Sequence, residues 1–277
     1  MEPTVEHKDG IDFLKSLKDN SVDLILTDPP YIISKKSGMN KFAKEIIKIE
    51  ESGQNKKTEK EWEEYKKKKK LLDDKYKENY IKYGNASGKK YTLKTDYGEW
   101  DKEFSMEKLQ EFVNLFYKKL RKGGTCIIWF DLWKLSYLKE IMENYKFKQI
   151  RFIEWVKTNP MPLNQKINYL TTSREIALLG VKGGKPTFNS KYDNGIYKFP
   201  IQSGKKGERH PTQKSLRLFE ELIKKHSNEG DLVVDPFLGG GTTVLACLKI
   251  KRKFKGCEIN KKYFDIIIHK LKNQENL

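Results

Sequence analysis

A proline-rich turn follows the first strongly apolar segment of this 277-residue chain. Residues 22–26 form a β-branched and aliphatic run, so Asp28 lies where a buried parallel strand ends and where open α/β sheets bind ligands. Pro29 and Pro30 stiffen the turn and offer carbonyls without N–H donors. An exocyclic amine could donate to the Asp28 carboxylate and the Pro29 carbonyl, which localises its lone pair, while Tyr31 stacks on the ring. The alternative is an ordinary strand-to-loop turn.

A glycine-rich segment near the other end of the chain suits a nucleotide-like ligand. Residues 231–234 are apolar, residues 235–243 read Asp-Pro-Phe-Leu-Gly-Gly-Gly-Thr-Thr, and residues 242–250 have a helical pattern. Such a turn lets the backbone and a helix N-terminus approach a ligand, although glycines can also be purely structural. No lysine follows as in a Walker loop, and Glu258 ends the next strand about 20 residues on, where an acidic residue commonly binds ribose hydroxyls. The pattern favours a nucleoside cofactor without a phosphate tail.

Together these segments resemble the motifs of the amino-group DNA methyltransferases, which use S-adenosylmethionine to methylate N6 of adenine or N4 of cytosine. Residues 28–31 resemble their catalytic motif, residues 235–243 their cofactor loop, and residues 210–214 (His-Pro-Thr-Gln-Lys) the segment that closes over the methionine part of the cofactor. The catalytic motif comes first, which is the permuted order of the subgroup called beta. The resemblance spans Asp9 to Tyr263 apart from one insertion.

The resemblance implies a role for each matching residue. It implies that the catalytic residues are Asp28, Pro29, Pro30 and Tyr31. It implies that the cofactor contacts Asp9, Gly10, His210, Thr212, Gln213, Lys214, Asp235, Phe237, Gly239, Gly241, Thr242, Thr243 and Glu258. DNA contacts would come from strands that flank the flipped base, at Trp155, Lys157 and Arg174. The chain departs from the family at Gly240, where serine is common, and at Lys8 and Gly10, which replace the usual glycine and cysteine around Asp9.

The target base is inferred from the residue before the two prolines. Aspartate is commoner there in the adenine enzymes and serine in the N4-cytosine enzymes, so Asp28 favours N6 of adenine, with N4 of cytosine as the alternative. The implied reaction is direct in-line displacement on a base flipped out of double-stranded DNA. A second copy of the chain or a cognate restriction endonuclease is a further candidate partner. An RNA or protein-glutamine methyltransferase fits the motif order less well, and a catalytically silent DNA-binding subunit would have lost one of the motifs.

Composition agrees with a nucleic-acid partner. The formal charge is +18 and the pI about 9.5, values typical of a phosphate-binding domain, although lysine richness also follows from codon usage. No apolar stretch approaches a membrane span, and the N-terminus lacks a signal-peptide profile. The cysteines, Cys126, Cys247 and Cys257, lie in apolar patterns and share no ligand spacing with the histidines. We therefore expect a cytoplasmic protein with buried thiols and no metal site.

The elements that must position these residues alternate along the chain. This alternation predicts a Rossmann-like, doubly wound, mostly parallel sheet of seven strands. The expected strands are Thr4–His7, Val22–Thr27, Thr125–Phe130, Gln149–Val156, Glu175–Val181, Leu232–Asp235 and Lys253–Glu258. The expected helices are Asp12–Leu17, Phe104–Arg121, Leu132–Asn144, Gln213–His226, Thr242–Ile250 and Lys261–Lys272, with Gly123 and Gly124 as a helix stop.

An inserted segment, residues 35–95, separates residues 1–34 from residues 96–277 of the catalytic domain. It is rich in lysine and glutamate, yet aromatic residues recur from Trp62 to Tyr83 at helical spacing, and residues 42–49 could form a partner helix across a turn at residues 52–55. We interpret the segment as a helical hairpin. It could pack on the sheet domain, grip DNA phosphates, or bind a second protein chain.

Overall fold

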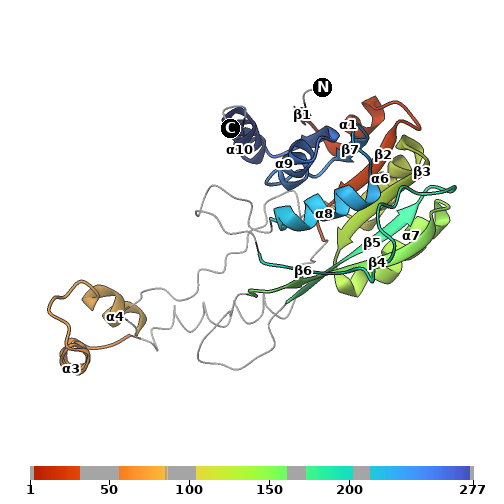
Figure 1. Ribbon diagram of the computed structural model, residues 1–277. Helices are drawn as coiled ribbons and strands as arrows, with labels where there is room; N and C mark the ends of the chain where they lie inside the picture. The colour runs from red at the N-terminus through yellow and green to blue at the C-terminus, as the bar shows by residue number, and fades with distance from the viewer. Residues whose placement is uncertain are drawn as a thin grey trace. The chain divides into compact units, whose positions relative to one another are not determined.

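Eight strands form a single sheet in the part of the chain that the structure describes, in the order β1-β8-β7-β2-β3-β5-β4-β6. The computed structural model describes residues 3–31, 56–84, 86, 104–160, 173–201 and 213–274 (Figure 1). The strands are β1 (Thr4–His7), β2 (Val22–Thr27), β3 (Leu120–Phe130), β4 (Lys148–Lys157), β5 (Arg174–Val181), β6 (Ile196–Phe199), β7 (Leu232–Asp235) and β8 (Lys253–Glu258). From β1 to β3 all neighbours are parallel, whereas β5 is antiparallel to both β3 and β4.

The largely parallel α/β sheet is confirmed, but the predicted count of seven strands is wrong. The eighth strand, β6, pairs in parallel with β4 and forms one edge of the sheet. It has only four residues, of which Tyr197 alone is buried. An edge strand this short carries too little apolar alternation to be recognised from sequence.

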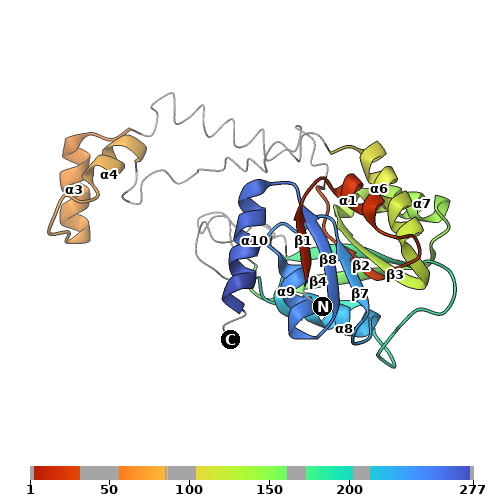
Figure 2. The ribbon, with the colours of Figure 1, turned by 90° about the horizontal axis from the view of Figure 1, so that it is seen from above.

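Helices cover both faces of the sheet, and each face has its own apolar core (Figure 2). The helices are α1 (Gly10–Ser16), α6 (Met106–Lys119), α7 (Leu135–Asn144), α8 (Leu216–His226), α9 (Thr242–Lys249) and α10 (Lys261–Gln274). On one face α1, α6 and α7 pack against residues such as Ile25 and Ile128, and on the other α8, α9 and α10 pack against residues such as Leu24 and Ile127. Adjacent strand residues thus point into opposite cores, as a doubly wound sheet requires.

The predicted helix stop at Gly123 and Gly124 is wrong. Helix α6 ends at Lys119, and both glycines lie within β3. Gly123 has φ +78° and donates its N–H to the carbonyls of Lys182 and Gly183. A Cβ there would lie 2.4 Å from the Lys185 carbonyl oxygen, so glycine allows the chain after β5 to approach β3 closely.

The chain divides into two compact units, residues 1–32 with 104–277 and residues 33–103. In the second unit, α3 (Glu59–Lys69) begins with a capping box between Thr58 and Glu61, and α4 is Lys77–Tyr83. The prediction of one continuous aromatic stripe from Trp62 to Tyr83 is wrong, because α3 ends at Lys69 and the residue that caps it, Lys70, is left-handed with φ 53°. The predicted partner helix and turn at residues 42–55 lie outside the described residues.

The aromatic residues of the two short helices pack against each other instead. Trp62 is fully buried, its ring centroid lies 5.9 Å from that of Tyr65, and Tyr65 stacks on Tyr80 at 4.4 Å. The Trp62 indole N–H donates to Asp74 at 3.0 Å. A helical hairpin is therefore present in this unit, but both of its described helices follow the predicted turn at residues 52–55.

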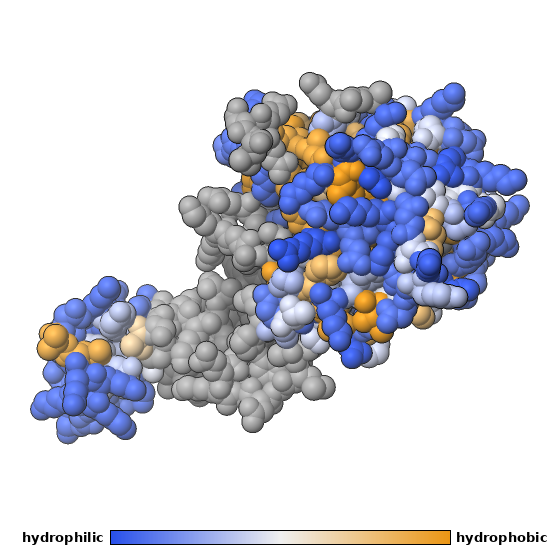
Figure 3. Space-filling view, in the orientation of Figure 1, coloured by the Kyte–Doolittle hydropathy of each residue, from blue (hydrophilic) through white to orange (hydrophobic). Residues whose placement is uncertain are grey.

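Hydrophilic side chains cover most of the face of the larger unit seen in Figure 3. Among the described residues, no helix combines the length and apolar character needed to cross a membrane. All three cysteines are buried and unpaired, and burial raises the pKa of each thiol. The prediction of buried thiols is therefore confirmed.

Candidate active site

The carboxyl ends of four neighbouring parallel strands bring both predicted motifs to one edge of the sheet. Asp28 follows β2, Asp235 ends β7 and Glu258 ends β8, while Asp9 lies two residues beyond the end of β1. Register fixes this arrangement, because His7 pairs with Glu258. Ligands of open α/β sheets bind at this edge.

The glycine loop is tied to the end of β8 by backbone donors. The carboxylate of Glu258 accepts from the N–H of Gly239 at 2.7 Å and from that of Asn260 at 2.8 Å. Burial raises the pKa of Glu258 above its ordinary value, although the two backbone N–H donors act in the opposite direction. Gly241, with φ +82°, precedes α9, and a Cβ there would lie 3.0 Å from Ile267. The loop therefore requires glycine at this position.

Asp9 and Phe237 border the same region of the edge. Asp9 is exposed and caps α1, because its Oδ1 accepts from the N–H groups of the first helical turn. The Phe237 ring packs 4.5 Å from that of Phe112. A Cβ at Gly10 would lie 2.8 Å from the Phe112 ring, so this chain has no room for the cysteine that the family usually has there.

Asp235 is buried and fully engaged within the protein. It accepts from the Thr27 hydroxyl at 2.7 Å, the Thr243 hydroxyl at 2.5 Å and the Phe237 N–H at 3.0 Å. Only 2% of the residue is exposed, and burial raises its pKa to about 6. Thr242 is also buried. Asp235 thus joins β2, β7 and α9, and its direct contact with the cofactor stays a prediction.

The catalytic turn is held by the short 3-10 helix that follows β3, Leu132–Lys134. The Lys134 ammonium donates to the Tyr31 carbonyl at 2.9 Å, and the Tyr31 ring lies edge-on to Phe130 at 6.0 Å. Pro29 and Pro30 are buried. Asp28 Oδ1 is buried and has no hydrogen-bond partner among the described residues. A buried carboxylate oxygen without a donor is unusual in a folded protein, which points to an acceptor reserved for a ligand.

Lys214, expected at the cofactor, contacts this turn with its side chain. Its ammonium contacts Asp28 Oδ2, Glu175 Oε2 at 3.0 Å and the Tyr31 hydroxyl at 3.1 Å. Sequence reasoning missed Glu175, which also pairs with Lys157 at 2.7 Å. The sequence holds a signal for this contact. Glu175 stands at the start of one expected strand and Lys157 near the end of the preceding one, and opposite charges on neighbouring strands can form an ion pair.

The structure separates the remaining predicted residues. Trp155 is only 1% exposed and donates its indole N–H to the Phe199 carbonyl, so the expectation of a DNA contact there is contradicted by its burial. Lys157 is largely buried beside Glu175, whereas the Arg174 side chain is 69% exposed and stays a prediction. Gln213 is half-buried, and its Oε1 has no hydrogen-bond partner among the described residues. His210 and Thr212 lie outside the described residues.

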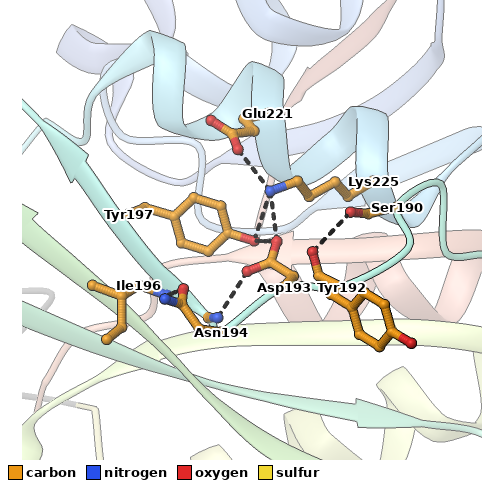
Figure 4. A network of polar contacts seen from close by, with 9 residues as sticks. Ser190, Tyr192, Asp193, Asn194, Ile196, Tyr197, Glu221 and Lys225 are labelled. Carbon is orange, nitrogen blue, oxygen red and sulfur yellow. Dashed lines mark hydrogen bonds and ion pairs between the residues drawn. The ribbon is translucent and has the colours of Figure 1, made fainter.

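A separate polar cluster lies at the β6 edge of the sheet (Figure 4). The Lys225 ammonium contacts Asp193 at 2.5 Å and Glu221 at 2.6 Å, and the Tyr197 hydroxyl donates to Asp193 at 2.6 Å. The Lys225 ammonium also lies 4.5 Å from the Tyr197 ring centroid. These polar groups satisfy one another, so the cluster joins α8 to β6 and thereby fixes the helix that follows Lys214.

The glycine loop and the proline-rich turn lie at the same edge of the sheet, as expected for an amino-group methyltransferase. The chain belongs to the N6/N4 methyltransferase family, described as DNA methylase, whose sequence profile matches residues 22–269. Among curated relatives, the type II methyltransferase M2.DpnII of Streptococcus pneumoniae is 28% identical over 94% of this chain and 86% of its own length. The type II methyltransferase M2.MboI of Moraxella bovis is 26% identical over 92% of this chain and 82% of its own length.

Solved structures agree with this assignment. The M1.HpyAVI complex with S-adenosylmethionine is 25% identical, covers 97% of this chain and 100% of its own, and has a TM-score of 0.61. The cytosine-N4-specific PvuII DNA methyltransferase, at 15% identity, matches in fold with a TM-score of 0.64 over 100% of this chain and 92% of its own. The protein is thus an S-adenosylmethionine-dependent amino DNA methyltransferase.

The residues at the sheet edge fit this cofactor. Glu258 offers carboxylate oxygens of the kind that bind a ribose diol, and Asp9 offers one to an adenine amino group. Phe237 supplies an aromatic wall, and the glycine loop has no lysine for a phosphate tail. When bound, S-adenosylmethionine supplies an electrophilic methyl group. Among the described residues, no cluster of His, Cys, Asp and Glu side chains is arranged to hold a metal ion.

Proposed function

We propose that this protein methylates N6 of adenine in double-stranded DNA. The observation that carries the proposal is Asp28 Oδ1, a buried acceptor in the catalytic turn that has no donor among the described residues. In this proposal Oδ1 accepts one hydrogen of the amine and the Pro29 carbonyl accepts the other, while Tyr31 stacks on the flipped base. Both acceptors draw the amine hydrogens out of the plane of the ring. The nitrogen lone pair is then less delocalised into the ring, which makes the nitrogen a better nucleophile.

Asp28 supports adenine over cytosine only through the family resemblance, because the same hydrogen bonds serve either amine. The motif order of this chain, with the catalytic turn before the glycine loop, supports membership of the beta subgroup. We also propose that Asp9, Gly239, Gly241 and Glu258 hold the cofactor, and that Asp235 and Thr243 position the loop. A homodimer or a cognate endonuclease is part of the same proposal, since the named relatives are type II methyltransferases.

The target base is tested by mass analysis of nucleosides from DNA treated with the purified chain and S-adenosylmethionine. We expect N6-methyladenine as the sole new nucleoside. N4-methylcytosine in its place would overturn the adenine assignment but leave the amine chemistry intact. Absence of both, with cofactor binding intact, would favour a silent partner subunit.

We further propose that the inserted unit, residues 35–95, contacts DNA phosphates. Its described helix α3 ends with four consecutive lysines, of which Lys67, Lys68 and Lys69 are exposed. Lysines at this density suit phosphates and carry little base information. In this proposal the inserted unit raises the affinity for DNA and does not select the recognition sequence.

Replacing Lys67, Lys68 and Lys69 with glutamine should lower the salt dependence of DNA binding. Each lost phosphate contact reduces the slope of log K against log salt by about 0.9, so we expect a reduction of about 2 to 3. The matched control replaces three exposed lysines near the amino ends of β2 and β8, Lys18, Lys251 and Lys253, and should leave the slope unchanged. An unchanged slope for the α3 variant, and for deletion of residues 40–83, would eliminate the DNA-arm proposal.

A further inference from the structure

The ammonium of Lys214 has no capacity left for a cofactor. An ammonium has three N–H donors, and Lys214 has three acceptors around it, on Asp28, Glu175 and Tyr31. Its side chain is only 4% exposed, and it lies over the Tyr31 ring at 5.3 Å. The three N–H donors of the ammonium are thus matched by acceptors on the catalytic turn and on strand β5.

We propose that Lys214 is a positioning residue of the amine site, which holds Asp28 Oδ2 so that Oδ1 is presented to the target amine. This inference rests on the proposed role of Asp28. A carboxylate joined to its backbone by two rotatable bonds can turn either oxygen toward a substrate. With Oδ2 bound by Lys214, only Oδ1 remains, and it is the oxygen without a partner among the described residues.

Charge supports the same role. Burial raises the pKa of Asp28, and the Lys214 ammonium opposes that rise. A protonated Asp28 would offer a donor where the amine needs an acceptor, so the ammonium keeps the turn competent. Burial also opposes ionisation of Glu175, yet Lys214 and Lys157 hold its pKa below the ordinary value.

Glu175 and Lys157 complete a chain of alternating charges that fixes Lys214. Glu175 contacts Lys214 at 3.0 Å and Lys157 at 2.7 Å, so the four groups Asp28, Lys214, Glu175 and Lys157 sum to zero net charge. Buried ion pairs of this kind often stabilise a fold less than apolar residues of similar size would. Their location at the catalytic turn, with one carboxylate oxygen left over, favours a role in the reaction.

The rest of the fold anchors Lys214 from both sides. It lies two residues before α8, whose buried residues Leu218, Phe219 and Leu222 pack on the sheet. The Lys225 ammonium at the far end of α8 binds Asp193 next to β6. The lysine therefore approaches Asp28 from the segment that leads into an anchored helix, and strand β5 supplies its second carboxylate partner, Glu175.

The test compares Lys214→Met, which keeps length and loses charge, with Lys214→Arg, which keeps charge. For Lys214→Met we expect kcat at saturating cofactor and DNA to fall on the order of 100-fold, the size of a small misplacement of reacting groups. The dissociation constant for S-adenosylmethionine should change less than about threefold, and Lys214→Arg should recover part of kcat. The acidic limb of the pH profile should move to higher pH, because Asp28 loses the ammonium that lowers its pKa.

An effect on cofactor binding in place of kcat would overturn the proposal. A rise of tenfold or more in the cofactor dissociation constant, with kcat preserved at saturation, would make Lys214 a cofactor ligand. If Lys214→Met does not fold, Glu175→Gln carries the test, since it keeps the side-chain shape and should reduce kcat with the same preserved cofactor binding; an unchanged kcat and pH profile would overturn the proposal. Failure of the proposed function is recognised separately, because the wild-type protein would then form no methylated nucleoside.

Discussion

Asp28→Asn should abolish methyl transfer to DNA while leaving S-adenosylmethionine bound. The substitution keeps the size of the side chain but exchanges a carboxylate, with acceptors on both oxygens, for an amide with a single oxygen. The Lys214 ammonium needs an acceptor and would bind the single amide oxygen. The amide NH2 would then face the target amine, so that two hydrogen-bond donors oppose each other. We expect a fall in kcat of about 1,000-fold or more, since both orientation and nucleophilicity are lost.

The measurement is labelled methyl transfer under saturating conditions, paired with calorimetric binding of S-adenosylmethionine. Cofactor affinity is expected within threefold of wild type, because the proposed cofactor residues Asp9 and Glu258 follow other strands. Retained transfer at a tenth of the wild-type rate or better would refute the catalytic assignment of Asp28. The matched control is Asp131→Asn in the loop beside the turn, whose carboxylate pairs with Lys134 and should affect rate far less.

The sequence predicted the catalytic edge well because parallel strands align their ends. Asp28, Asp235 and Glu258 each stand at the end of an expected strand, and pairing in register places such ends together without any knowledge of side-chain contacts. Strand identity was predictable for the same reason, since Val22–Thr27 and Lys253–Glu258 agree with the observed bounds. Local patterns thus determine both the fold class and the position of the site.

Contacts between distant side chains could not be predicted in this way. Lys214 and Asp28 are separated by 186 residues, and a charge pair across that distance leaves no periodic signal. The burial of Trp155 depends on which core a strand residue enters, and helices cover both faces here, so an apolar residue fits either face. The break between α3 and α4 was missed because Lys70 adopts a left-handed conformation, which cannot be predicted from a lysine in the sequence.

Asp235→Ala should destabilise the protein and slow transfer together, because one carboxylate ties three elements. The substitution leaves the Thr27 and Thr243 hydroxyls and the Phe237 N–H without their acceptor in a site that is 2% exposed. Each unsatisfied buried group costs about 1 to 3 kcal/mol, so we expect a loss of roughly 3 kcal/mol in the free energy of unfolding, measured by denaturant titration. Transfer should slow because Thr27 directly precedes the catalytic Asp28.

The pH dependence of stability separates this role from simple packing. The folded pKa of Asp235 is about 6, above the ordinary 3.8, so its protonated form stabilises the fold and that contribution is lost as pH rises through 6. Relative to the matched Asp235→Asn control, which does not titrate, the wild-type protein should gain roughly 1 kcal/mol between pH 7.5 and pH 5. A constant difference between the two proteins across this range would mean that the carboxylate ionises in the fold as readily as in water. The hydroxyls of Thr27 and Thr243 would then stabilise the anion enough to offset its burial, and the junction between β2 and α9 would be held by charge at every pH where the enzyme acts.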